Sequence, residues 1–266
     1  MPPRKKKEEP KDENNGRIIN MYERLPKELL EQPENPNYAL HKLKLPFRMC
    51  VVAPSGSGKT NFVVNLIGLF SKGKGTFASV DIITRNKDEP LYKWLEQKTE
   101  GQIVIKEGLE NTPQLDKFDK QENHLVIFDD LVLADSLKKV ENYYIRCRKL
   151  NVSVIFLSQS YFKIPKIIRN NCSYLVLLKL SGHREINMIL SEGGLGVDKD
   201  DLLRIYQYAT AEKFSPLIID YEGEINERYR KGLLEIIDPA RFLNVPKGKA
   251  VENEMVYEPN EKDWKK

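Results

Sequence analysis

The sequence predicts an α/β fold with a mostly parallel central sheet that is flanked by helices. From Phe47 onward, short β-branched runs alternate with longer amphipathic runs, a pattern typical of βαβ units. The runs Leu125 to Phe128 and Val152 to Leu157 are apolar throughout, as expected for central strands buried on both faces. A glycine-containing loop also separates the first apolar run from the first long amphipathic run. Together these observations favour a parallel sheet with helices on both sides.

The elements follow one another regularly along the chain. Strands are expected in the runs FRMCVVAP, SVDIITR, QIVIKEG, HLVIFDDL, VSVIFLSQS, SYLVLLKL and, as the last strand, FSPLIIDYEG. Helices are expected in TNFVVNLIGLFSK, PLYKWLEQK, DSLKKVENYYIRCRKL, PKIIRNN and SGHREINMILSEGGLGVDKDDLLRIYQYAT. The last of these contains a helix break at Gly193-Gly194.

Four regions of different composition divide the 266 residues. Residues 1–16 are dense in Lys, Glu, Pro and Asn and are expected to form a disordered charged tail. Residues 17–46 contain several prolines and read as an irregular lead-in to the α/β domain, which we place at 47–234. Residues 235–266 are polar and contain proline, and we expect them to form a C-terminal extension.

Composition excludes several functional classes. The formal net charge is only +4, and because acidic and basic residues are intermixed, any contact with a polyanion must be local. No apolar run is long enough to span a bilayer and the N-terminus is charged, so we expect a soluble, intracellular protein without a membrane anchor. The three cysteines show no CxxC spacing, which supports neither a disulfide framework nor a zinc ribbon.

The stretch APSGSGKT has the spacing of a phosphate-binding P-loop. The template is G-x-x-x-x-G-K-[ST], and the stretch matches every fixed position except the first, where alanine replaces glycine. An apolar strand precedes it and an amphipathic helix follows it, which is the context that the motif requires. The predicted nucleotide-binding residues are Ala53, Pro54, Ser55, Gly56, Ser57, Gly58, Lys59 and Thr60.

Each residue type in this loop suits one part of a nucleoside triphosphate. Gly56 and Gly58 allow backbone N–H groups to curl around the β-phosphate without interference from a Cβ atom. Lys59 can contact the β- and γ-phosphates, and the Thr60 hydroxyl can ligate Mg²⁺. The helix that begins near Thr60 adds the positive end of its dipole. We therefore predict a working ATP site, and the substitution to Ala53 does not disable it.

The apolar run HLVIFDDL ends in two carboxylates, as a Walker B strand does. The first acid of such a pair holds Mg²⁺ through water, and the second can act as general base on the attacking water. We assign the metal role to Asp129 and the base role to Asp130. The alternative is an acidic pair that only caps a loop.

The next apolar run, NVSVIFLSQS, also ends in polar residues. If this strand lies beside the Walker B strand, Gln159 comes close to the γ-phosphate, where an amide can sense phosphate and orient water. A purely structural role for Gln159 in capping the loop is the alternative.

The order of these motifs resembles the packaging ATPases of the FtsK/HerA superfamily. The resemblance rests on the P-loop, the FDD sequence, the strand that ends in SQS and the following YFKIPKIIRNN, and it spans about Leu45 to Leu180. It is nearest to the A32-type genome-packaging ATPases of nucleocytoplasmic large DNA viruses and virophages. The resemblance implies a RecA/FtsK-like fold, and it implies that Gln159 is the sensor.

The resemblance further implies a homo-oligomeric ring, commonly a hexamer, that drives viral double-stranded DNA into a preformed capsid. It implies an arginine that acts on the neighbouring subunit's nucleotide, for which Arg146, Arg148 and Arg169 are candidates and Arg148 and Arg169 are favoured. Each could instead form a surface ion pair. Partners would be a capsid or portal vertex, and the location a viral assembly site in host cytoplasm or nucleus, with possible association with the virion.

Three other functions remain open on the sequence. A helicase or recombinase with the same core would act on single-stranded nucleic acid, with Tyr143-Tyr144 or Tyr161-Phe162 as stacking platforms. A nucleotide kinase would need an acceptor pocket and an arginine-rich lid. A nucleotide-gated assembly protein would have lost hydrolysis, although the intact motifs argue against this. Lys163 and Lys166 are either DNA-phosphate contacts or part of a solvated loop.

Overall fold

The computed structural model of the protein describes residues 18–26, 32–131, 137–192 and 197–242. The expected tail at 1–16, the expected break at Gly193-Gly194 and most of the expected C-terminal extension lie outside these residues. The chain divides into the units Met1–Gln32 and Pro33–Lys266. In the first unit, the 3₁₀ helix η1 (Met21–Arg24) is capped by the Asn20 side chain, which accepts a hydrogen bond from the Tyr22 N–H.

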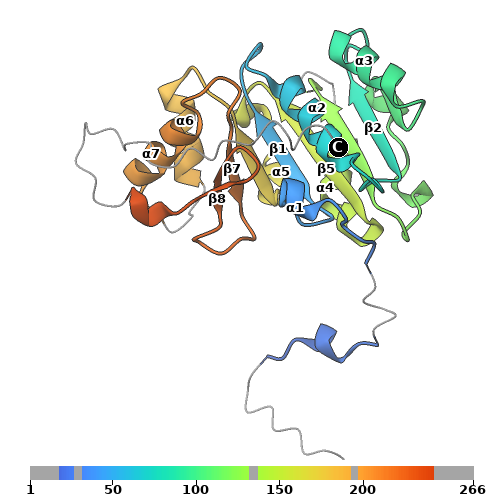
Figure 1. Ribbon diagram of the computed structural model, residues 1–266, viewed down its shortest axis with the longest axis horizontal. Helices are drawn as coiled ribbons and strands as arrows, with labels where there is room; N and C mark the ends of the chain where they lie inside the picture. Colours follow the sequence, from blue (N-terminus) through green and yellow to red (C-terminus); the bar gives the residue numbers. More distant parts are fainter. Residues whose placement is uncertain (1–17, 27–31, 132–136, 193–196, 243–266) are drawn as a thin grey trace, which may run out of the picture. The chain divides into compact units, whose positions relative to one another are not determined.

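A nine-stranded sheet forms the centre of the second unit (Figure 1). Its order is β3-β2-β4-β5-β1-β6-β7-β8-β9, and every pair from β3 to β6 is parallel. The pairs from β6 to β9 are antiparallel. The predicted mostly parallel sheet is therefore confirmed. The strands are β1 (Arg48–Val52), β2 (Ser79–Thr84), β3 (Ile103–Glu107), β4 (His124–Asp129), β5 (Val152–Ser158), β6 (Tyr174–Leu177), β7 (Leu217–Asp220), β8 (Tyr229–Lys231) and β9 (Glu235–Ile237).

Helices cover both faces of this sheet. The α-helices are α1 (Tyr38–His41), α2 (Lys59–Phe70), α3 (Pro90–Lys98), α4 (Lys138–Arg146), α5 (Lys166–Asn170), α6 (His183–Glu192) and α7 (Lys199–Ala209). The remaining 3₁₀ helices are η3 (Leu109–Asn111), η4 (Leu115–Lys117), η5 (Cys147–Leu150), η6 (Tyr161–Lys163) and η7 (Pro239–Arg241). Within the described part of the chain, no helix is long and apolar enough to cross a membrane.

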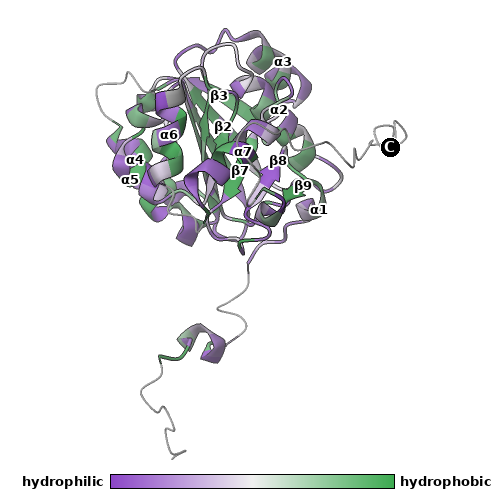
Figure 2. Cartoon of the chain, turned by 90° about the vertical axis from the view of Figure 1, so that its left-hand side faces the viewer, coloured by the Kyte–Doolittle hydropathy of each residue, from purple (hydrophilic) through white to green (hydrophobic). Residues whose placement is uncertain are grey.

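Two hydrophobic cores lie on opposite faces of the sheet. Along β4, Leu125 and Ile127 join the core that contains α2 and α3, whereas Val126 and Phe128 join the core that contains α4 to α7. The run is continuously apolar because both of its faces are covered. Figure 2 shows the same arrangement, with green strands at the centre and purple segments on the surrounding helices.

Two strands beyond the last expected one extend the sheet. The run FSPLIIDYEG contains β7, as expected, but β8 and β9 follow it as antiparallel neighbours. Each has only three residues, too few for alternation to be recognised in the sequence. Strand β9 begins at Glu235, where the C-terminal extension is expected to begin.

The residues before β1 are anchored to the helical layer. The Asn37 side-chain amide donates hydrogen bonds to the carbonyls of Phe70 and Lys72 at the end of α2. The His41 ring packs edge-on against Phe70 at 4.8 Å between centroids and is fully buried. Its Nδ1 accepts a hydrogen bond from the Leu43 N–H. This segment is irregular but part of the core.

Burial of His41 predicts a pH-dependent loss of stability. Desolvation, aided by the positive charge of Arg230, lowers the pKa of His41 to about 4. Below pH 6.5 the unfolded chain gains a proton at this residue that the folded protein does not take up until about pH 4. The free energy of unfolding should therefore fall by about 2 kcal/mol between pH 7 and pH 5 from this group alone. Urea titrations of wild type and His41→Gln at both pH values test this prediction. The free energy of unfolding of the variant should fall measurably less between pH 7 and pH 5 than that of wild type, and equal decreases would contradict the prediction.

Candidate functional site

The pocket lies at the edge of the sheet where parallel strands end at matching registers. Val52 pairs with Ser158, and Asp129 pairs with both Thr84 and Leu157. The loops that follow four strands therefore meet at one place, the usual location of a ligand site in a parallel sheet. The pocket there has a volume of about 520 Å³. It is lined by Ser55, Gly56, Gly58, Lys59, Thr60, Asn61, Thr84, Asn86, Glu89, Leu91, Asp129, Asp130, Gln159 and Phe214.

The P-loop joins β1 to α2. Gly56 and Gly58 have φ values of +74° and +97°, which side chains with a Cβ rarely adopt. Ala53 does not share this backbone conformation; it is fully buried and its N–H donates to the Ser158 carbonyl at 3.1 Å. The first template position therefore does not need glycine in this chain, which gives a structural reason for the substitution.

Lys59, the first residue of α2, holds the loop closed from inside. Its Nζ donates to the carbonyl oxygens of Ala53 at 2.7 Å and Pro54 at 3.1 Å. Burial lowers the pKa of Lys59, and the negative charges of Asp129 and Asp130 oppose that shift. An ammonium group so placed is drawn toward any anion that enters the pocket.

The two carboxylates after the apolar part of β4 lie in different environments. Asp129 is 8% exposed, and its Oδ2 accepts a hydrogen bond from the Tyr92 hydroxyl at 2.7 Å. Burial raises the pKa of Asp129, the bond from Tyr92 opposes this shift, and the charge of Asp130 adds to it. Asp130 is exposed, and its φ of +53° turns the chain sharply out of the strand.

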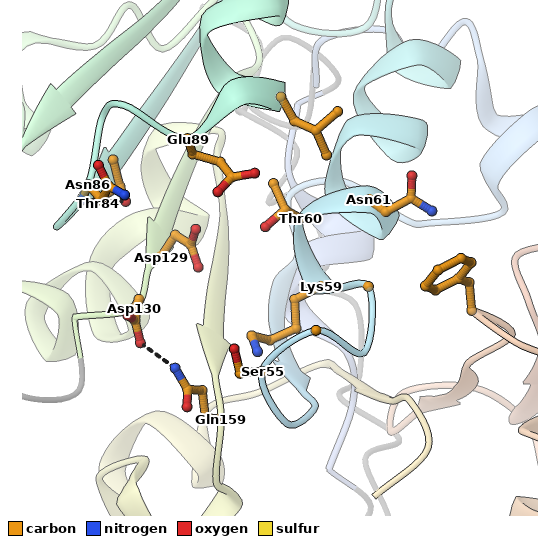
Figure 3. Close-up of a pocket in the computed structure, with 14 residues that line it drawn as sticks. Ser55, Lys59, Thr60, Asn61, Thr84, Asn86, Glu89, Asp129, Asp130 and Gln159 are labelled. Atoms are coloured by element: carbon orange, nitrogen blue, oxygen red, sulfur yellow. Dashed lines mark hydrogen bonds between the residues drawn. The ribbon is translucent and has the colours of Figure 1, made fainter.

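Gln159 contacts the second of these acids. Strand β5 lies between β4 and β1, so the residue that follows it reaches the pocket between the Walker B acids and the P-loop. The Gln159 Nε2 donates to Asp130 Oδ1 at 3.1 Å (Figure 3). The predicted proximity of the two strands is therefore observed, and it brings the amide to the acids.

Sequence reasoning missed several side chains that share this pocket. Glu89 follows β2 and precedes α3, and Figure 3 shows it facing the same space as Asp129 and Thr60. Tyr92 is fully buried in α3 and fixes Asp129 from behind. Phe214 comes from the loop before β7. The usable signal for Glu89 was its place after an expected parallel strand; Tyr92 and Phe214 belong to no motif.

The favoured arginines lie outside the pocket lining. Arg148 precedes β5, at the opposite edge of the sheet, and pairs with Glu222 at 3.5 Å. Arg169 in α5 pairs with Glu192, and its guanidinium lies 4.8 Å from the centroid of the Tyr161 ring. Arg146 pairs with Asp116 at 3.0 Å. Within this chain, none of the described lining residues is an arginine.

Three features define the class of P-loop nucleoside triphosphatases: a strand that ends in a P-loop, a strand that lies between it and the Walker B strand, and acids beside a partly buried lysine. Residues 37–223, more than half of the chain, match the family described as Poxvirus A32 protein. The chain belongs to this family.

Two individual relatives are similar to the chain over much of its length. The DNA packaging protein OPG160 of vaccinia virus (strain Copenhagen) is 29% identical over 197 residues, covering 69% of this chain and 72% of the relative. The protein of the same name from monkeypox virus is also 29% identical, covering 69% and 64%.

Solved structures with a similar fold are more remote. The genome packaging NTPase B204 from Sulfolobus turreted icosahedral virus 2, in complex with AMP, has a TM-score of 0.49 at 11% identity, covering 71% of this chain and 98% of that one. ATPases 2 and 3 of EssC from Geobacillus thermodenitrificans have a TM-score of 0.48 at 11% identity, covering 73% and 40%. Both similarities are too remote to bear on function.

Proposed function

We propose that this protein is an ATP-hydrolysing motor that moves viral double-stranded DNA into a preformed capsid. The observation that carries the proposal is the convergence in one pocket of the P-loop, the two Walker B acids and Gln159. Membership of the poxvirus A32 family, together with the similarity to relatives named DNA packaging proteins, supports DNA as the substrate.

The P-loop holds the triphosphate. The backbone from Ser55 to Thr60 surrounds the β-phosphate, and the positive end of the α2 dipole faces it. Lys59 exchanges its two carbonyl partners for β- and γ-phosphate oxygens, a shorter charge-assisted contact.

The charges of the lining fit a magnesium nucleotide better than free ATP. Three carboxylates, from Glu89, Asp129 and Asp130, face one ammonium group, from Lys59, among the described lining residues. A hydroxyl and carboxylates are the oxygen ligands that Mg²⁺ prefers, and Thr60 and Asp129 are the residues that would hold it. Bound there, the ion would neutralise charge on the β- and γ-phosphates.

Asp130 and Gln159 act on the hydrolytic step. Asp130 is the general base that takes a proton from the attacking water, because it is the exposed acid of the pair and stands beside the amide. Gln159 orients that water and contacts the γ-phosphate. Because the Gln159 amide also bonds to Asp130, binding or loss of the γ-phosphate changes the contacts of this general base. It changes the contacts at the end of β5 at the same time, because Gln159 directly follows that strand.

The contacts with DNA and between neighbouring subunits form in the assembled motor. We expect a homo-oligomeric ring, with a hexamer favoured, in which Arg148 or Arg169 stabilises charge at the neighbouring nucleotide. Lys163 and Lys166 are exposed and available for sequence-independent contacts with phosphate. The capsid or portal vertex is the remaining partner, at a viral assembly site in the host cytoplasm or nucleus and in association with the virion.

The alternative functions find little support among the described residues. Tyr143, Tyr144 and Tyr161 are buried in the core, so of the four aromatic residues considered as a single-strand stacking platform only Phe162 is exposed. Among the described residues of the pocket lining there is no arginine of the kind that a kinase lid would bring to the phosphates. Duplex DNA remains the favoured substrate.

Steady-state ATP hydrolysis tests this function. We expect duplex DNA to stimulate turnover, and single strands of equal length to stimulate it far less. The assay is made at low salt because phosphate contacts weaken as salt rises. A Lys163→Glu, Lys166→Glu double variant should keep its DNA-free rate and lose stimulation, whereas Lys74→Glu, on another surface, should retain it. Stimulation mainly by single strands would replace the packaging motor with a helicase.

A further inference from the structure

The wall of the pocket is polar almost everywhere, and Phe214 is the one aromatic side chain among the described lining residues. Leu91 is the other large apolar member, and it lies in α3, two residues after Glu89. A nucleoside triphosphate has one apolar, planar part, the base, and that part needs an apolar or aromatic surface. The position of Phe214 along the bound nucleotide therefore matters.

Phe214 packs directly on the P-loop. A methyl group at Gly58 would lie 2.5 Å from Cδ1 of the Phe214 ring, so the ring rests against the residue that caps α2. Gly58 is thus required both by its φ of +97° and by this aromatic neighbour. The contact places the ring at the start of α2.

The positions of the acids determine the direction in which a bound triphosphate lies. Asp129, Asp130 and Gln159 lie on one side of Lys59, and Asn61 lies on the other (Figure 3). Because the γ-phosphate is directed toward the acids and the amide, the α-phosphate, ribose and base must extend the other way, past the start of α2. Phe214, in contact with Gly58, stands at that end.

The loop holds this ring in an unfavourable backbone conformation. Phe214 has φ +67°, the left-handed region that glycine or asparagine normally fills in a turn. The turn is closed by a hydrogen bond from the Ser215 N–H to the Glu212 carbonyl at 3.3 Å, and Glu212 pairs with Lys231 at 2.6 Å. A bulky residue in such a conformation points to a functional site.

The ring is available to a ligand. Phe214 is 45% exposed, unlike the aromatic residues of the core, and the Lys213 Nζ lies 4.9 Å from its centroid. We propose that Phe214 stacks on the purine base of the bound nucleotide and that the turn from Glu212 to Ser215 is the base-binding element of the site. This inference rests on the proposed ATP site and adds the residue that recognises the nucleoside.

Equilibrium binding with two probes separates base stacking from phosphate binding. Calorimetry in Mg²⁺ gives the Kd of ATP and of inorganic tripolyphosphate, which has phosphates but no base. Phe214→Leu should weaken ATP binding by about tenfold, within the range of one base–aromatic stack, and leave tripolyphosphate binding unchanged. Leucine keeps the unfavourable backbone position but has no ring, and Phe214→Tyr should restore tight ATP binding. Phe162→Leu removes a similarly exposed ring outside the pocket and should change neither Kd.

Each result bears on the inference separately from the motor function. Equal ATP affinity in wild type and Phe214→Leu would overturn the stacking role. Equal weakening of both probes would also overturn it, since Phe214 would then only support the P-loop at Gly58. A wild type that binds ATP tightly but does not hydrolyse it would refute the motor while leaving the stacking result valid. A wild type that binds tripolyphosphate but not ATP would overturn both.

Discussion

A Lys59→Ala variant is expected to fold normally and to lose ATP turnover by about 10³-fold or more. The lysine is the one cationic side chain among the described lining residues, and its ammonium lies 2.7 Å from the Ala53 carbonyl in a partly buried position. No other cationic side chain of this lining can stabilise the charge that develops on the transferred phosphoryl group.

The same burial explains why the fold should survive. Desolvation lowers the pKa of Lys59, so the charged side chain is held in the pocket at a cost in stability, and alanine removes that cost together with two hydrogen bonds. We expect the free energy of unfolding of Lys59→Ala, measured by thermal denaturation, to lie within about 1 kcal/mol of the wild-type value.

Lys74→Ala is the matched control for Lys59→Ala. It deletes an exposed lysine that pairs with Glu34 outside the pocket, and it should leave turnover unchanged. Turnover of Lys59→Ala within tenfold of wild type, in a folded protein, would refute the P-loop assignment.

The sequence alone predicted the parts of the fold that repeat a local pattern. Strand β4 was recognisable because the run Leu125 to Phe128 is apolar throughout, and α2 because Phe62, Leu66 and Phe70 recur at helical spacing. Strands β8 and β9 were not, because three residues carry no period. The extension of the sheet depends on tertiary pairing with β7.

The candidate site divides in the same way. The P-loop, Asp129, Asp130 and Gln159 follow strand ends, so sequence order together with parallel pairing brings them to one edge. Tyr92 reaches Asp129 from 37 residues away, and Phe214 reaches Gly58 across most of the domain. No spacing rule encodes such contacts, because they depend on how α3 and the turn before β7 pack. The roles proposed for Arg148 and Arg169 would need a neighbouring subunit, and within this chain both arginines form ion pairs away from the pocket.

The pocket contains two candidates for the base that activates water, and their surroundings predict different effects. Asp130 is exposed and bonded to Gln159 at 3.1 Å, whereas Glu89 lies on the side of Thr60 and Asp129, and its charge raises the pKa of Asp129. We therefore place Asp130 at the attacking water and Glu89 near the metal position. Asp130→Asn should lower kcat by about 10²- to 10⁴-fold, the usual contribution of a general base, and leave the Kd of ATP nearly unchanged.

Glu89→Gln should lower kcat by less than about tenfold and mainly raise the Mg²⁺ concentration needed for half-maximal rate, since it removes one of three carboxylates from the lining. Asparagine at position 130 keeps an oxygen to accept the Gln159 amide, so the substitution removes proton transfer with little change in geometry. Asp88→Asn, one residue from Glu89 and paired with Lys93 on the surface, controls for loss of negative charge and should have no effect.

Single-turnover measurements at saturating ATP and Mg²⁺ separate the roles of the two acids. A larger loss of rate in Glu89→Gln than in Asp130→Asn would transfer the base role to Glu89 and leave Asp130 with the positioning of Gln159.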